Sequence, residues 1–208
     1  MNKNRSLIRR TAAGAAVGAA TLVLAACGSG DDSSVGHDGR SSKPPSASSS
    51  ASQGQQNLAD VAFAKGMIPH HRQAVEMADL APTRAESAEV KKLAAEIEKA
   101  QAPEIKTLAG WLTTWGEQVP AEGAMNHSAH GTGGMMTVEE MDRLEKTSGK
   151  AFDTAFMELM IKHHEGAVTM AKTEKADGAF ADAKKMADAI IASQSAEIST
   201  MNRLLGKN

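Results

Sequence analysis

Apolar residues recur at spacings of three and four along two long stretches of the chain, as they do in amphipathic helices. In the first stretch, the spacing predicts a helix over residues 57–80, which Pro82 is expected to end. Thr83 and Glu86 have the spacing of a capping box, so a second helix is expected to start there and to end near Gly116. No stretch of the sequence alternates with a period of two, and the pattern therefore predicts an all-α fold.

The second stretch repeats the first. Residues 153–205 align with residues 60–112 at a constant shift of 93 positions without a gap, and 21 of the 53 positions are identical. Gly178 is expected at the turn of the second hairpin, and Gly206 follows its last helix. Two helical hairpins with one apolar stripe each bury these stripes best against one another. We therefore expect a four-helix bundle with a pseudo-twofold axis.

A segment of different composition, residues 117–136, separates the two repeats and is rich in Gly and other small residues. Thr137 and Glu140 have the spacing of another capping box, which predicts a short helix from Val138 to about Lys146. The segment contains five residues with thioether or imidazole donors, namely Met125, His127, His130, Met135 and Met136. We expect a loop that wraps a soft metal ion separately from the bundle, and a plain linker is the alternative.

The N-terminal residues have the pattern of a lipoprotein signal peptide. Basic residues that include Arg9 and Arg10 precede an uncharged run over residues 11–26, which is shorter than the roughly 20 residues of a membrane-spanning helix. The run ends in Leu-Ala-Ala-Cys, a lipobox pattern, so Cys27 is expected to carry the lipid. We predict a signal peptide over residues 1–26 and an exported protein, lipid-anchored to the outer face of the cell membrane. A plain secretory signal and a twin-arginine signal are the alternatives.

Composition and charge predict the domain organisation. Residues 27–56 are mostly Ser, Gly, Asp and Pro, which predicts a flexible tether, and residues 57–208 suffice for one compact domain. Within this domain we expect the first repeat at 57–116, a Met/His linker at 117–149 and the second repeat at 150–208. Removal of the signal peptide changes the formal net charge from −2 to about −6, which argues against a nucleic acid partner. Since Cys27 is the only cysteine, a soft metal site in the folded part would have to use methionine sulfur.

Two pairs of neighbouring histidines occupy the same place in the two repeats. His70 and His71 match His163 and His164, and the helical spacing puts each pair on or beside an apolar face. Methionines lie three positions before and seven positions after the first histidine of each pair, at Met67, Met77, Met160 and Met170. Such residues also occur as plain core residues, but buried polar groups without partners cost about 1–3 kcal/mol each. A metal or carboxylates must therefore satisfy these imidazoles, and the set predicts a metal site.

The donor types favour copper. Thioether sulfur with imidazole suits Cu(I), and imidazole alone also serves Cu(II) or Zn(II), so other divalent metals stay open. A di-iron site of the ferritin type needs Glu-x-x-His on its helices. Here Met67-x-x-His70 and Met160-x-x-His163 have a thioether in place of the carboxylate, which makes the site softer.

Further polar residues lie on the apolar face of the second helix in each repeat. They are Gln101, Glu104, Gln194 and Glu197. One interpretation is that they fix the register of the helices by hydrogen bonds. The other, which we favour, is that they accept the second N–H of a ligating imidazole and so hold its orientation.

The stretch from Phe63 to Ala78 strongly resembles the bacterial domain-of-unknown-function family number 305. Its pattern Met-x-x-His-His-x-x-Ala-Val-x-Met occurs again between Phe156 and Ala171, and the resemblance extends over residues 57–205. Pro69 belongs to the family's first copy, and Lys162 replaces it in the second. The resemblance implies a ferritin-like fold and CopM-like periplasmic copper-binding proteins, linked to copper tolerance, as relatives. It also implies that the ligand-bearing positions are Met67, His70, His71, Met77, Met160, His163, His164 and Met170.

The function that we expect is extracytoplasmic copper sequestration or delivery through His and Met ligands, in copper tolerance, and not an enzymatic activity. The expected partners are metal ions, the membrane through the lipid on Cys27, and an unidentified cuproprotein or copper transporter. Two alternatives stay open at this point: a metal-dependent oxidoreductase on a ferritin-like scaffold, and a structural interaction module that binds no metal.

Overall fold

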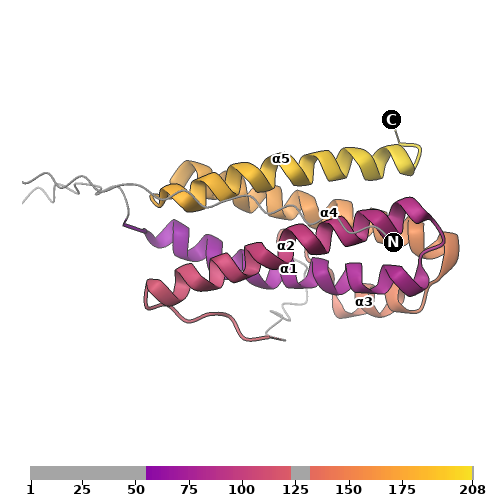
Figure 1. Ribbon diagram of the computed structural model, residues 1–208, viewed down its shortest axis with the longest axis horizontal. Helices are drawn as coiled ribbons and strands as arrows, with labels where there is room; N and C mark the ends of the chain where they lie inside the picture. The colour runs from indigo at the N-terminus through magenta and orange to yellow at the C-terminus, as the bar shows by residue number, and fades with distance from the viewer. Residues whose placement is uncertain (1–54, 123–131, 208) are drawn as a thin grey trace, which may run out of the picture. The chain divides into compact units, whose positions relative to one another are not determined.

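The computed structural model describes residues 55–122 and 132–207, and every regular element in these stretches is a helix. The all-α prediction is confirmed. The described residues form four long helices and the short helix α3, and Figure 1 shows the long helices lying alongside one another. The elements are α1 (Leu58–Arg84), α2 (Ala88–Thr114), the 3-10 turn η1 (Thr132–Gly134), α3 (Val138–Glu145), α4 (Gly149–Asp177) and α5 (Ala181–Leu204). The predicted signal peptide, Cys27, nearly all of the predicted tether, and Met125, His127 and His130 lie outside the described residues.

The four long helices form two hairpins that pack through their first helices. Helix α1 packs against α2, α4 packs against α5, and α1 and α4 pack against each other, so α1 and α4 are the central pair (Figure 1). The predicted four-helix bundle is confirmed. Among the described helices, none is both long enough and apolar enough to cross a membrane.

The buried apolar residues form two clusters with the histidines between them. On α1, Phe63 to Ile68 belong to one cluster and Ala74 to Ala81 to the other. On α4, the order is reversed, because Phe152 to Met160 belong to the second cluster and Ala167 and Ala171 to the first. The histidine pairs lie between these segments on both helices, and they therefore form a polar layer between the two apolar clusters.

Two aspartates at equivalent positions tie the hairpins together reciprocally. The Asp60 carboxylate, in the first repeat, accepts hydrogen bonds from the backbone N–H groups of Ala179 and Phe180 in the turn before α5, at 3.1 and 2.9 Å. The Asp153 carboxylate, in the second repeat, accepts from the N–H groups of Glu86 and Ser87 in the turn before α2, at 3.1 and 2.9 Å. Each repeat thus satisfies backbone donors in the turn of the other, as a pseudo-twofold arrangement requires.

The turn of the first hairpin differs from its prediction. Helix α1 does not end before Pro82 but continues to Arg84, and the predicted capping box at Thr83 does not form. The cap of α2 is Ser87, whose hydroxyl accepts from the N–H groups of Glu89 and Val90. The Glu86 N–H, which a cap at Thr83 would have to bind, donates to Asp153 of the other repeat instead, and Ala81 in the last turn of α1 is fully buried.

The other predicted helix boundaries agree with the structure. Thr137 and Glu140 form a complete capping box at the start of α3, as predicted. Gly116 and Gly206 follow α2 and α5 with φ angles of 73° and 70°, which are accessible to glycine at little cost and are typical of helix C-termini.

Candidate metal centre

The four predicted histidines are buried together where α1 and α4 meet. His70 is 1% exposed, and His71, His163 and His164 are fully buried. The ring centroids of His70 and His163 are 3.8 Å apart, and those of His163 and His164 are 6.4 Å apart. The structure therefore brings the two sequence-distant pairs into one layer.

Two of the imidazoles are held by glutamates of the outer helices. Nε2 of His71 lies 2.8 Å from Oε2 of Glu104 on α2, and Nε2 of His164 lies 2.6 Å from Oε2 of Glu197 on α5. An ionised carboxylate only accepts hydrogen bonds, so Nε2 carries a proton in each ring, and Nδ1 is the nitrogen that could bind a metal in the neutral form. These contacts fit both interpretations of the glutamates, since they orient the imidazoles and also join each outer helix to its central helix.

The other two imidazoles have environments that keep them neutral. Nε2 of His70 donates to the backbone carbonyl of Gly133 at 2.9 Å. Burial, together with the neighbouring imidazoles of His71 and His164, lowers the pKa of His70 to about 3. Burial also holds the pKa of His163 well below its ordinary value, and the nearby imidazoles act in the same direction. Both rings are therefore uncharged at neutral pH.

Several buried nitrogens of this layer have no hydrogen-bond partner in the described structure. They are Nδ1 of His70, His71 and His164 and both ring nitrogens of His163. A buried polar atom without a partner costs about 1–3 kcal/mol, and each neutral imidazole retains a lone pair that can bind a metal. The layer thus contains several imidazole nitrogens that have no hydrogen-bond partner and could bind a metal.

The four predicted methionines lie on both sides of the histidine layer. Met77 of α1 and Met160 of α4 belong to one apolar cluster, and both are fully buried. Met67 of α1 is fully buried in the other cluster, against which the half-buried Met170 of α4 packs. Each cluster therefore contains one of the predicted thioethers from each repeat.

The prediction that the Met/His segment is separate from the bundle is wrong for Met136. Its side chain is 5% exposed and packs in the cluster that contains Met77 and Met160. The Gln73 amide explains this position, because it accepts from the Met136 N–H at 2.7 Å and donates to the Met136 carbonyl at 3.0 Å. With both backbone groups satisfied, the segment can be buried without an unpaired polar group. Met135 is half-buried.

The two predicted glutamines differ from the two glutamates. Gln101 and Gln194 are 2% and 3% exposed, and their Oε1 atoms have no hydrogen-bond partner in the described structure. No group of three or more His, Cys, Asp or Glu side chains within residues 55–122 and 132–207 is arranged to hold a metal ion. The other side chains with donor atoms in the two flanking clusters are thioethers.

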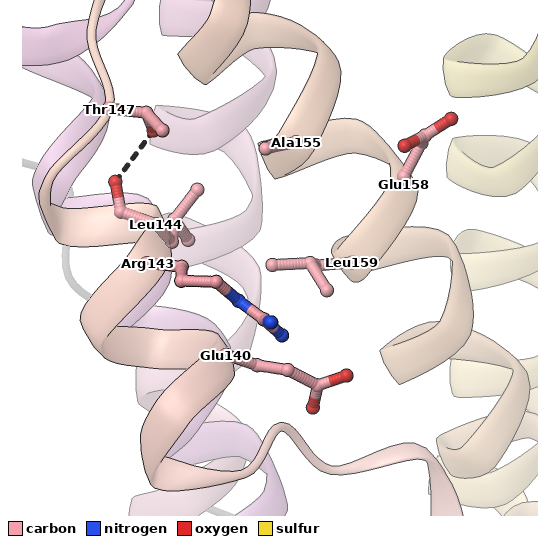
Figure 2. A pocket seen from close by; sticks show the side chains of 7 residues that line it. All are labelled: Glu140, Arg143, Leu144, Thr147, Ala155, Glu158 and Leu159. Carbon is pink, nitrogen blue, oxygen red and sulfur yellow. Dashed lines mark hydrogen bonds between the residues drawn. The ribbon is translucent and has the colours of Figure 1, made fainter.

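A surface cleft of about 290 Å³ lies between α3 and α4, away from the predicted ligands. Figure 2 shows Glu140 and Arg143 extending from α3 toward α4, which contributes Ala155 and Leu159 to the lining, while Leu144 lies beside Arg143 on α3. Glu140 pairs with Lys162 at 3.2 Å, and Glu158 at the rim pairs with Lys207 at 2.8 Å. Both carboxylates of the cleft are thus paired with lysines, and none of the predicted metal ligands lines it.

Three residues at the histidine layer were missed from the sequence: Gln73, Gly133 and Gly166. Gln73 binds the Met136 backbone, Gly133 accepts from His70, and Gly166 contacts the segment around Gly133. A signal was present, since Gln73 and Gly166 are equivalent positions at which the repeated His-His-x-x-Ala-Val pattern differs between the copies.

Comparison with known proteins places these features in a family. A comparison with curated proteins finds no match. Among solved structures, a DUF305 protein of Streptomyces coelicolor that is predicted to be secreted is 35% identical, with a TM-score of 0.64, and the match covers 72% of this chain and 93% of that protein. CopM in its Cu(II)-bound form is 36% identical, with a TM-score of 0.62 and coverage of 70% and 94%. A DUF305 fragment from Deinococcus radiodurans is 27% identical, with a TM-score of 0.66 and coverage of 73% and 98%.

The model of the family described as "Domain of unknown function (DUF305)" matches residues 60–205, which contain both repeats and the whole histidine layer. The family resemblance predicted from the repeated histidine motif is therefore confirmed, and the chain belongs to the DUF305 family.

Proposed function

We propose that this protein is an extracytoplasmic copper-binding lipoprotein that sequesters or delivers copper through the histidine layer and the methionines beside it. The observation that carries the proposal is the set of buried imidazole nitrogens without partners, which lies between two clusters that each contain two of the predicted thioethers. Copper is the cargo of the protein in this proposal, and the protein performs no turnover on it.

The chemistry of the donor set supports copper. Neutral imidazole and thioether together suit Cu(I), and the imidazoles alone also suit Cu(II). Because the pKa of His70 is lowered to about 3, protons do not compete with a metal for its free Nδ1 at neutral pH. The metal-binding residues in the proposal are His70, His71, His163 and His164 with Met67, Met77, Met160 and Met170.

Glu104 and Glu197 have a different role in the proposal. Each accepts the Nε2–H of one imidazole and so directs the unprotonated Nδ1 away from the carboxylate. Hydrogen bonds of this kind orient metal-binding histidines in many proteins and raise their basicity. The carboxylates therefore position the ligands and do not bind the ion.

The solved relatives support the metal as well. CopM is described in Cu(I)-bound, Cu(II)-bound and Ag-bound forms, and the Cu(I)-bound form is 36% identical to this chain over 70% of its length. Silver is a common substitute for Cu(I), so these forms describe a protein that takes soft monovalent ions as well as Cu(II).

The proposed location follows from the N-terminal pattern. A signal peptide over residues 1–26 would export the chain, and a lipid on Cys27 would anchor it to the outer face of the membrane. Residues 28–56 would then tether the bundle to the anchor, where it could exchange copper with a cuproprotein or transporter.

A metal titration tests the proposal. The full chain is titrated with Cu(I), Cu(II) and Zn(II), and so is the double variant His70→Ala with His163→Ala. We expect tight Cu(I) binding to the wild type and loss of most of it in the double variant. Wild-type protein that retains no metal at micromolar concentration would support the structural-module alternative, and O₂ or peroxide turnover by the copper-loaded protein would support the oxidoreductase.

A further inference from the structure

The two repeats carry different residues at one equivalent position beside the histidine layer. The residue of each repeat at this position contacts the same segment between the repeats. Gln73 of α1 and Gly166 of α4 are equivalent residues, each three positions after the first histidine of its pair. Both contact residues 133–136, which we call the strap. The strap belongs to neither repeat and packs against α4.

The contact with α1 is polar and specific. Gln73 is fully buried, and its amide both donates to and accepts from the Met136 backbone, at 3.0 and 2.7 Å. A side-chain amide provides both functions in one plane, which no apolar residue of the same size can do. Gln73 thus fixes one end of the strap.

The contact with α4 depends on the absence of a side chain. A Cβ on Gly166 would overlap the carbonyl oxygen of Gly133 and lie 2.9 Å from the backbone nitrogen of Gly134. A Cβ on Gly134 would in turn lie 3.1 Å from Cα of Gly166. Gly133 and Gly134 have φ angles of 73° and 83°, which side chains rarely allow. The backbones of strap and helix are therefore in direct contact.

The strap reaches the histidine layer at two points. The Gly133 carbonyl accepts the Nε2–H of His70, which leaves Nδ1 of His70 as the unprotonated nitrogen. The Met136 side chain packs in the cluster of Met77 and Met160. Docking of the strap therefore sets the tautomer of one imidazole and adds a thioether to one side of the layer.

We infer that Gln73 and Gly166 are positioning residues of the copper site: they dock the strap so that Gly133 orients His70 and Met136 joins Met77 and Met160 as a sulfur donor. The inference rests on the proposed function. In place of the separate metal site that the sequence predicted for the Met/His segment, Met136 becomes part of the central site. The difference between the repeats at Gln73 and Gly166 then has a function, because each residue holds the strap in its own way.

Two variants of the full chain test the inference, Gln73→Leu and Gly166→Ala. Gly110→Ala is the matched control, since Gly110 is helical and a Cβ there meets no atom within 4 Å. In the metal-free protein, hydrogen exchange of the Met136 amide reports docking, because this N–H donates to Gln73. We expect exchange at least tenfold faster in both variants than in the wild type and the control, with unchanged helical circular dichroism.

The second measurement is Cu(I) affinity, determined in competition with bicinchoninate. We expect binding at least tenfold weaker in both variants and unchanged in the control. The methyl resonance of Met136 in protein labelled with ¹³C at methionine methyl groups should shift on addition of Ag(I) to the wild type and not to the variants. A role in folding alone would leave this spectroscopic difference absent.

The outcomes separate the inference from the proposed function. Wild-type Cu(I) affinity in variants with faster Met136 exchange would overturn the positioning role and leave copper binding intact. Unchanged Met136 exchange in both variants would show that these residues do not dock the strap, which also overturns the inference. Absence of Cu(I) binding by the wild type would remove the proposed function, and the inference with it.

Discussion

His70 and His163 face each other across the pseudo-twofold axis with their ring centroids 3.8 Å apart, although 93 positions separate them in the chain. A rotation axis between two copies of one unit brings like residues together in this way. Neither ring is charged at neutral pH, since burial lowers both pKa values. The centre of the layer therefore needs both hairpins, and a single repeat would not form it.

Copper should raise the unfolding temperature of the protein, because a ligand that binds only the folded state stabilises it by mass action. At a free concentration one hundred times the dissociation constant, the stabilisation is about 2.7 kcal/mol. Thermal unfolding followed by circular dichroism, with and without Cu(I), measures it. His70→Ala with His163→Ala should abolish most of the rise, whereas an unchanged rise in a helical double variant would rule these histidines out as ligands.

Glu104→Leu should weaken copper binding by about 10- to 100-fold, the usual effect of losing a residue that orients a metal-binding histidine. The hydrogen bond from His71 Nε2 disappears in this variant, so the ring is no longer fixed. Glu104→Gln keeps an acceptor and should have a much smaller effect. Affinities from chelator competition give the comparison.

The control for this pair of variants is Glu98→Leu, an exposed position of the same helix, which should leave the affinity unchanged. By the pseudo-twofold relation, Glu197→Leu should behave as Glu104→Leu does. If Glu104→Leu lowers the free energy of unfolding without changing the affinity, the carboxylate only fixes the register of the helices.

Met77→Leu with Met160→Leu should reduce Cu(I) affinity at least tenfold and change Cu(II) and Zn(II) binding little, because leucine keeps the volume but removes the soft sulfur donor. The matched control is Met157→Leu with Met201→Leu, two buried methionines of the same cluster that are not predicted ligands. Both double variants should lose less than about 1.5 kcal/mol of stability per site. Equal Cu(I) affinity in the two double variants would make Met77 and Met160 packing residues.

Glu174 should make the stability of the metal-free protein depend on pH. Its side chain is 1% exposed and lies against Asp60, with Asp177 and Lys184 also near. Burial, a hydrogen bond with Asp60 and the negative charge of Asp60 raise the pKa of Glu174 to about 8, and Lys184 opposes them only in part. Burial acts to raise the pKa of Asp60, but the adjacent Glu174 and the backbone N–H groups of Asn57, Phe180 and Ala179 lower it.

The sign of the effect follows from proton binding. Between the ordinary value of 4.5 and about 8, folded Glu174 holds a proton that the unfolded chain releases. The contribution of Glu174 to the free energy of unfolding is therefore complete below pH 4.5 and is lost as the pH rises through about 8. Over this range the free energy of unfolding falls by at most about 1.4 kcal/mol per pH unit. Urea unfolding of wild type and Glu174→Gln over this range measures it. The free energy of the wild type relative to the variant should fall with pH, and a constant difference would contradict the prediction.

Much of the fold could be predicted from the sequence because it depends on local or repeated patterns. Helical spacing of apolar residues, the capping box at Thr137 and the 93-residue repeat predicted the helices, the short α3 and the bundle. The prediction for the turn after Pro82 was wrong, because the Glu86 N–H that the predicted cap requires is bound by Asp153 of the other repeat, a contact that no local pattern indicates. Asp60 and Asp153 were aligned as a pair, but their bonds to the opposite hairpin could not be derived from the repeat alone.

The sequence by itself determined which residues are the candidates for metal binding, since paired histidines with methionines at fixed helical spacing are a property of one helix and its copy. Only the tertiary structure decided which of these residues meet. His70 contacts His163, and Glu104 and Glu197 accept hydrogen bonds from His71 and His164. The strap brings the Met136 side chain into the core. The physical reason is that helical spacing fixes the direction of a side chain, whereas the packing of separate helices and the direct backbone contact at Gly166 fix its neighbours.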